Sequence, residues 1–149
     1  MIIDKKNMVN PFKFPISASK LLPHKRPMLL LDKLVFCSTN FATGVTIIKQ
    51  NNIFLLSNEV EEIIFIELMA QTYGAFQGYL ALKNNLPIPE GFLVGVQDIQ
   101  IKGQATCGDT LKVEVKHITS FHQFSLVLGK VFKNTKIIAC GKIKLWAKN

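Results

Sequence analysis

The stretch over residues 63 to 82 constrains the fold most, because it is long, apolar and free of proline. It is too long for one strand and rich in good helix formers, so it predicts a single α-helix. Its apolar residues lie all round the helix, which indicates a helix that the rest of the chain covers on most sides. Gly74 and Gly78 lie inside it, where glycine costs about 1 kcal/mol relative to alanine. We therefore expect another segment to pack close to that part of the helix.

Glu67 carries the only formal charge in this stretch, and Gln71 follows four positions later on the same helical face. A carboxylate in an apolar helix, with no lysine four positions away, is costly to bury. Two explanations stay open. Neighbouring backbone or Gln71 satisfies the carboxylate structurally, or the carboxylate takes part in chemistry.

The composition predicts one globular domain over residues 1–149, with residues 1–15 as an N-terminal lead-in. Charged residues make up 19% and hydrophobic residues 48% of the chain, which is typical of a folded protein with a core. A transmembrane role for the helix is disfavoured, since its glutamate and glutamines would be costly in lipid. The first residues lack the apolar core and cleavage site of a signal peptide, so we expect a cytoplasmic protein.

The three cysteines, Cys37, Cys107 and Cys140, are widely spaced and follow no metal-binding or redox pattern. We interpret them as reduced packing residues. The net charge of +8 comes from lysines that mostly alternate with apolar residues, as on the solvent face of a sheet. The same charge would attract an acidic carrier protein, whereas no motif supports nucleic-acid binding.

The remaining sequence predicts about five or six strands that short turns connect, which implies antiparallel pairing. A short helical turn capped by Ser17 or Ser19 is expected within residues 16–22, and the apolar run at 28–31 is expected to begin a strand. Residues 51–62 are expected to be irregular and to cap the helix with polar and acidic side chains. The predicted strands cover residues 34–38, 41–49, 92–102, 110–119, 124–132 and 136–147. The architecture predicted is an α+β fold, a sheet curled around one helix.

Several motifs carry a family resemblance in their order and spacing. Residues 21–32 read Leu-Leu-Pro-His-Lys-Arg-Pro-Met-Leu-Leu-Leu-Asp, and residues 66–71 read Ile-Glu-Leu-Met-Ala-Gln. Gly95-Val96 and Gly108-Asp109-Thr110-Leu111 follow later. Together these motifs resemble the β-hydroxyacyl-[acyl-carrier-protein] dehydratases, and most closely the divergent dehydratase-like branch of aryl-polyene biosynthesis.

The resemblance implies a hot-dog fold, in which an antiparallel sheet wraps around one long central helix. It also implies a dimer with a continuous sheet and active sites at the subunit interface, either a homodimer or a heterodimer with another hot-dog subunit. The implied reaction is dehydration of β-hydroxyacyl thioesters on acyl carrier protein to trans-2-enoyl thioesters, without a metal or organic cofactor.

The predicted catalytic residues are Glu67 and His24, because dehydration needs an acid at the β-hydroxyl and a base at the α-carbon. An apolar surrounding favours a protonated carboxyl group, and a histidine suits the base. Gln71, Met69, Pro27 and Gly95 are predicted to bind substrate. His24 has a second interpretation, as a loop histidine that fixes the turn between Pro23 and Pro27.

One departure from the family pattern concerns the base. Standard dehydratases carry a histidine in a Gly-His-Phe-Pro-Gly loop before the helix, whereas residues 53–62 of this chain contain none. His117 is expected at the surface on the lysine-bearing face of its strand, and His122 in a turn. Two alternatives therefore stay open: a hot-dog thioesterase in which the helix carboxylate activates water, and a non-catalytic subunit that binds acyl chains or completes a partner's active site.

Overall fold

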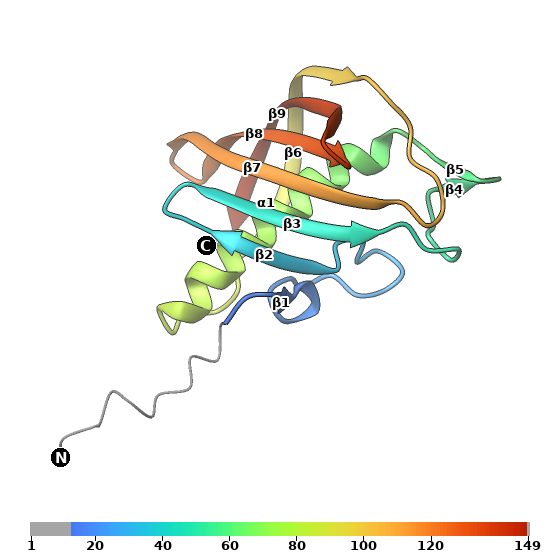
Figure 1. The fold of residues 1–149 in the computed structure, drawn as a ribbon. Coiled ribbons are helices and arrows are strands. Elements are labelled where there is room, and N and C mark those ends of the chain that lie inside the picture. The colour runs from blue at the N-terminus through green and yellow to red at the C-terminus, as the bar shows by residue number, and fades with distance from the viewer. Residues whose placement is uncertain (1–12, 149) are drawn as a thin grey trace.

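The computed structural model describes residues 13–148, so most of the predicted lead-in lies outside the described residues. A seven-stranded sheet forms the main layer, in the order β1-β2-β3-β7-β8-β9-β6, and its paired neighbours run antiparallel (Figure 1). The strands are β1 (Ile16–Ser17), β2 (Lys33–Cys37), β3 (Phe41–Ile47), β6 (Glu90–Ile101), β7 (Thr110–Phe121), β8 (Phe124–Lys133) and β9 (Lys136–Lys148). The predicted antiparallel pairing is confirmed.

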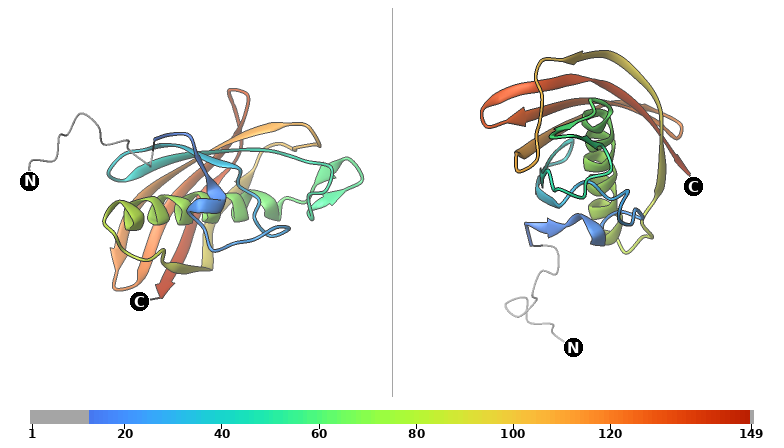
Figure 2. Two further views of the ribbon diagram at one scale, coloured as in Figure 1. Left: turned by 90° about the horizontal axis from the view of Figure 1, so that it is seen from below. Right: turned by 90° about the vertical axis from the view of Figure 1, so that its right-hand side faces the viewer.

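The long helix α1 (Ile63–Lys83) lies against one face of this sheet, and the sheet curves around it (Figure 2). Phe65, Leu68 and Phe76 of the helix are almost completely buried in the core. Burying one such side chain contributes about 1.5–3 kcal/mol, so the helix is held mainly by its packing. The predicted helix and the α+β architecture wrapped around it are confirmed.

The segment before β2 covers the side of the helix that faces away from the sheet (Figure 2). A Cβ atom at Gly78 would collide with the backbone oxygen of Leu21, and one at Gly74 would lie 2.9 Å from Leu22 Cδ2. The close approach expected at these two glycines is therefore confirmed. It fixes the segment that leads directly into His24.

The short helical turn predicted in this segment is present as η2 (Ala18–Lys20), but its predicted serine cap is wrong. The Ser17 side chain makes no capping hydrogen bond, and its hydroxyl instead pairs with that of Ser19 at 2.9 Å. The turn is held by backbone bonds, from the amides of Leu21 and Leu22 to the carbonyl of Ala18.

The apolar run at residues 28–31 does not begin a strand, and β2 starts at Lys33. Leu29, Leu30 and Leu31 are buried as their hydrophobicity requires. The amides of Leu30 and Leu31 bond to the side chain of Gln71 rather than to a neighbouring strand. The buried Gln71 side chain thus accepts the hydrogen bonds that a neighbouring strand was predicted to accept from this run.

Residues 51–62 differ from the prediction in two ways. They contain a small hairpin, β4 (Leu55–Leu56) with β5 (Glu59–Val60), where an irregular segment was expected. No side chain caps the start of α1, because Glu62 already has helical backbone angles and makes no capping hydrogen bond.

His117 does not lie on the lysine-bearing face of β7, so that prediction is wrong. Side chains alternate along a strand, and His117 therefore shares the inward face of Leu111, Val113 and Val115, which are buried as predicted. Its ring stacks against that of Tyr73 in the helix, with 6.3 Å between the ring centroids and 14° between the planes. His122 lies in the β7–β8 turn, as predicted, with a φ angle of 54°.

Candidate functional site

A cavity of about 170 Å³ lies between the helix, the segment before β2 and the ends of three strands. The helix supplies Glu67, Ala70, Gln71, Tyr73, Gly74 and Gln77 to its wall. The rest of the wall consists of Leu22, Pro23, His24, Pro89, Gly91, Leu93, Gln123, Ser125, Leu145, Trp146 and Ala147. The cavity therefore opens near the edge strand β6, at the end of the sheet where β6, β8 and β9 lie side by side.

The segment before β2 holds His24 on this wall. Leu21 and Leu22 are anchored on the helix, and the Lys25 carbonyl accepts hydrogen bonds from the amides of Met28 and Leu29 just after it. His24 Nε2 lies 4.0 Å from Glu67 Oε1, and both side chains are about a quarter to a third exposed. This distance exceeds a hydrogen bond, so the two groups are close enough to act on one small molecule without being tied to each other.

His24 Nδ1 is buried and has no hydrogen-bond partner among the described residues. A buried polar atom without a partner is costly, and such atoms occur where a structure serves a purpose other than stability. Nε2 is thus the ring nitrogen that reaches Glu67 and remains available to a bound molecule.

Gln71 joins the helix to the segment that carries His24. Its Oε1 accepts hydrogen bonds from the amides of Leu30 at 2.9 Å and Leu31 at 3.1 Å. Its Nε2 donates to the Met28 carbonyl at 2.8 Å and to Glu67 Oε1 at 3.1 Å. A primary amide offers two acceptor positions and two donors, so all four are used inside the protein. Gln71 lies on the cavity wall, but its amide is committed to holding the site together.

The orientation of that amide decides what Glu67 can do. Two backbone amides must meet an oxygen, so the nitrogen of Gln71 faces Glu67 and donates to Oε1. Oε1 is therefore an acceptor, and Oε2 is the oxygen of Glu67 that the Gln71 amide leaves open.

Asp32, the last residue of the first motif, fastens the other end of the same segment. Its carboxylate accepts a hydrogen bond from the Ile47 amide at 2.9 Å and pairs with Lys49 at 2.6 Å and Arg26 at 3.8 Å. Both ends of the segment that presents His24 are thus fixed.

Of the predicted site residues, the structure brings His24, Glu67 and Gln71 together and leaves three elsewhere. Met69 is fully buried between the helix and Gly129 of β8. Pro27 lines a separate small hollow beside Arg26, and Gly95 lies in β6 against the Lys144 side chain. None of the three lines the cavity of this chain.

Sequence reasoning missed Tyr73, Gln77, Gln123 and Ser125, which add polar groups to the wall. Tyr73 and Gln77 lie three and seven positions after Ala70, so helical periodicity could have placed them beside it. Gln123 and Ser125 come from the β7–β8 hairpin, and no local signal links that hairpin to the helix.

The thiols of Cys37, Cys107 and Cys140 are free, as expected, and burial raises the pKa of Cys37 to about 12. Residues 13–148 contain no cluster of histidine, cysteine and acidic side chains that could hold a metal ion. In the same residues no helix has both the length and the apolar character to cross a membrane.

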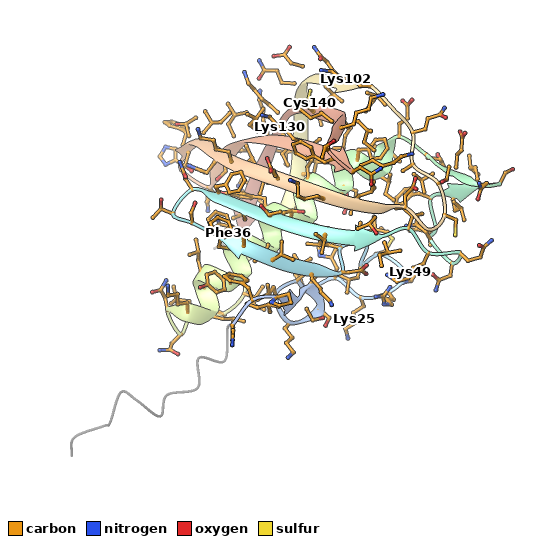
Figure 3. The ribbon with its side chains drawn as sticks, in the orientation of Figure 1. Lys25, Phe36, Lys49, Lys102, Lys130 and Cys140 are labelled. Atoms are coloured by element: carbon orange, nitrogen blue, oxygen red, sulfur yellow. The ribbon has the colours of Figure 1, made fainter. Side chains whose placement is uncertain are left out.

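The lysines do not gather at the cavity. Lys25 and Lys49 lie beside the β2 side of the sheet, and Lys102 and Lys130 lie on the opposite side of the molecule (Figure 3). The excess positive charge is therefore spread over the surface, as its alternation in the sequence predicted.

Comparison with known proteins identifies the family. The model of the ApeP-like family, described as ApeP dehydratase, matches residues 16–149. The chain belongs to the ApeP-like dehydratase family. This match covers both motifs that meet at the cavity, the one around His24 and the one around Glu67.

Individual relatives agree with this assignment. The 3-hydroxyacyl-[acyl-carrier-protein] dehydratase FabZ of Natranaerobius thermophilus is 30% identical over 133 residues, which are 83% of this chain and 89% of the relative. FabZ of Clostridioides difficile is 26% identical over 131 residues, with the same coverage. Among solved structures, the dehydratase heterocomplex ApeI:P of Xenorhabdus doucetiae matches with a TM-score of 0.84 at 20% identity, over 90% of this chain and 92% of that one.

The predicted hot-dog fold and dehydratase family are confirmed. The chain is a hydro-lyase of the group that dehydrates β-hydroxyacyl groups on acyl carrier protein, in fatty-acid or aryl-polyene biosynthesis.

Proposed function

We propose that Glu67 is the acid and His24 the base with which this chain dehydrates a β-hydroxyacyl thioester to a trans-2-enoyl thioester. The observation that carries the proposal is the 4.0 Å separation of His24 Nε2 and Glu67 Oε1 on the wall of one cavity. In the absence of a histidine from residues 53–62, His24 supplies the imidazole that the pre-helix loop supplies in standard dehydratases.

The proton transfers balance within this pair. His24 Nε2 takes the α-proton, and the electron pair of that C–H bond is held as an enolate on the thioester carbonyl. The pair then forms the Cα–Cβ double bond and expels the β-oxygen, which takes the proton of Glu67 and leaves as water. The proton on His24 then returns to Oε2 of Glu67 through bound water, because Nε2 lies 4.0 Å from Oε1 of the same carboxyl group, beyond a direct hydrogen bond.

Gln71 allows Glu67 to act as the acid and His24 as the base. Its hydrogen bond to Glu67 Oε1 directs the proton to Oε2, and its bonds to Leu30 and Leu31 keep the His24 segment against the helix. A positioned acid or base contributes about a hundredfold to ten-thousandfold in rate, provided that it reaches the atom it serves.

The assembly proposed is a dimer through β6. This strand of twelve residues is at the end of the sheet, and Phe92, Val94 and Val96 on it are about half exposed. A long edge strand with apolar side chains invites pairing with another strand. The partner is a second copy or another hot-dog subunit, and the similar ApeI:P structure of Xenorhabdus doucetiae is a dehydratase heterocomplex. Since the cavity lies beside β6, residues of the partner would complete its wall.

We place the reaction in the cytoplasm and expect an acidic carrier protein to approach through the dispersed lysines. Carrier binding should then weaken as salt rises from low concentration to about 0.5 M, because exposed charges are screened.

The test is the dehydration rate of a β-hydroxyacyl-[acyl-carrier-protein], measured for the purified chain alone and with a second hot-dog subunit. Glu67→Gln and His24→Ala should each lower kcat/KM by about a hundredfold to ten-thousandfold. Glu61→Gln, at an exposed position just before the helix, is the matched control and should change nothing. Full activity in Glu67→Gln would show that Glu67 is structural, and release of free acid would favour the thioesterase alternative.

A second candidate function, a subunit that completes its partner's site, is favoured by the missing pre-helix histidine. It predicts that the complex is active and that the activity survives both substitutions in this chain.

A further inference from the structure

A chain of hydroxyl groups leads from the cavity to His117. Tyr73 and Ser125 both line the cavity, and their side chains share a hydrogen bond. Ser125 Oγ lies 3.2 Å from Ser120 Oγ, and Ser120 Oγ lies 2.6 Å from His117 Nε2. Ser120 and Ser125 are direct partners across the β7–β8 hairpin, so the sheet register itself puts these hydroxyls in contact.

These hydrogen-bonded side chains form a second polar cluster on the cavity wall, apart from the cluster of His24, Glu67 and Gln71. Ala70, Gly74 and Gln77 follow one another at spacings of four and three on the helix, so they share a face between the two polar clusters. Glu67 and Gln71 flank that face on one side, and Tyr73 flanks it on the other. Tyr73 is 6% exposed and its ring lies nearly parallel to that of His117, so burial restricts the position of its hydroxyl.

We propose that Tyr73 is a further site residue, whose hydroxyl donates a hydrogen bond to the thioester carbonyl oxygen of the acyl substrate, and that Ser125, Ser120 and His117 are positioning residues that orient it. The proposal rests on the dehydration proposed above. A β-hydroxyacyl thioester has two oxygen atoms near the reacting carbons. Glu67 protonates the β-oxygen, which leaves the carbonyl oxygen to be bound by the second polar cluster, through Tyr73.

The spacing along the helix suits this assignment. Glu67 and Tyr73 are six residues apart, which is about 9 Å along the helix axis. The two side chains leave the helix on either side of the face formed by Ala70, Gly74 and Gln77, so a molecule lying across that face can meet both.

The direction of the hydrogen bonds follows from counting donors, because each hydroxyl has only one. Tyr73 can donate to the substrate only if Ser125 donates to Tyr73. Ser125 is free to do so only if it accepts from Ser120, which in turn accepts from His117 Nε2–H. Burial raises the pKa of Tyr73, with a smaller opposing effect of Ser125, so the phenol keeps its proton for this donation.

The decisive variant is Tyr73→Phe, which removes the hydroxyl and retains the buried ring. The enolate carries its charge on the carbonyl oxygen, and a hydrogen bond to a charged group is worth about tenfold to a hundredfold in rate. We expect Tyr73→Phe to lower kcat by that factor and to weaken binding of the acyl thioester by about threefold to tenfold, because the neutral carbonyl accepts the same hydrogen bond more weakly than the enolate does. Tyr79→Phe in the same helix is the matched control, since Tyr79 lies against Phe14 and outside the cavity wall.

The relay is tested by Ser120→Ala, with Ser38→Ala in the exposed β2–β3 turn as its control. Ser120→Ala should lower kcat in the same direction as Tyr73→Phe, and the double variant should be no slower than Tyr73→Phe alone. Additive losses would show that Ser120 acts independently, and an unchanged kcat in Tyr73→Phe would overturn the proposal. If wild type lacks activity, binding of an enoyl-pantetheine thioester, followed by calorimetry, still decides. Weaker binding by Tyr73→Phe than by Tyr79→Phe supports the carbonyl contact, and equal binding by both refutes it.

Discussion

Replacing Gln71 by leucine tests whether the buried amide holds the site together. Leucine has a similar volume, so the change leaves the helix packed while it removes four hydrogen bonds. The amides of Leu30 and Leu31 and the carbonyl of Met28 then lose their partner in an environment where water does not replace it. Each backbone group left unpaired costs about 1–3 kcal/mol, so for these three groups we expect a loss of about 3–9 kcal/mol in the free energy of unfolding. That is a large part of the roughly 5–15 kcal/mol by which domains are stable.

Urea unfolding followed by circular dichroism measures this loss. Gln77→Leu is the matched control, because Gln77 lies on the same helix, is half-buried and makes none of these four contacts. It should change the free energy of unfolding by less than about 1 kcal/mol. A Gln71→Leu protein within about 1 kcal/mol of wild type would refute the reasoning, since the backbone groups must then have found other partners.

Two further predictions concern groups whose pKa the fold shifts. The Thr106 amide, with a smaller contribution from Lys133, holds the pKa of Asp109 below its usual 3.8. The stabilisation of the folded protein that results is present at pH values above 3.8. It is lost as the pH falls through the lower pKa that Asp109 has in the folded state. Asp109→Asn should thus cost about 1 kcal/mol at neutral pH, with the difference closing as the pH falls below about 4 in urea unfolding; a pH-independent difference would contradict this. Since burial raises the pKa of Cys37 to about 12, iodoacetamide should modify it about a thousandfold more slowly at pH 8 than it modifies the urea-unfolded chain, as followed by mass spectrometry. Equal rates would show that the thiol is accessible and ordinary.

The parts of the fold that the sequence predicted well are those that depend on burial. The helix was recognisable because residues 63–82 are apolar all round, and the packing at Gly74 and Gly78 followed from the cost of glycine there. The inward face of β7 followed from the alternation of Leu111, Val113 and Val115. The same alternation places His117 inward, so its assignment to the lysine face was an error of register rather than a limit of the sequence.

The features that the sequence did not predict depend on side chains that form hydrogen bonds where a neighbouring backbone was expected to form them. The run at residues 28–31 has the hydrophobicity of a strand, and only the three-dimensional position of Gln71 turns it into a buried non-strand segment. Gln71 was predicted as a substrate contact, and its bond to Glu67 belonged to one of the two explanations left open for that carboxylate. Its bonds to Met28, Leu30 and Leu31 have no signal in the sequence. Likewise the link from Tyr73 to Ser125 joins residues 52 positions apart, and no periodicity connects them.

The central claim is that His24 removes the α-proton and Glu67 protonates the leaving oxygen. Its most direct test is exchange of the α-proton of a β-hydroxyacyl-[acyl-carrier-protein] in D₂O, measured by mass spectrometry alongside the loss of water. The account predicts that Glu67→Gln still exchanges the α-proton while its dehydration falls by about a hundredfold or more, and that His24→Ala loses both. Exchange that survives in His24→Ala, or dehydration that survives in Glu67→Gln, would contradict it.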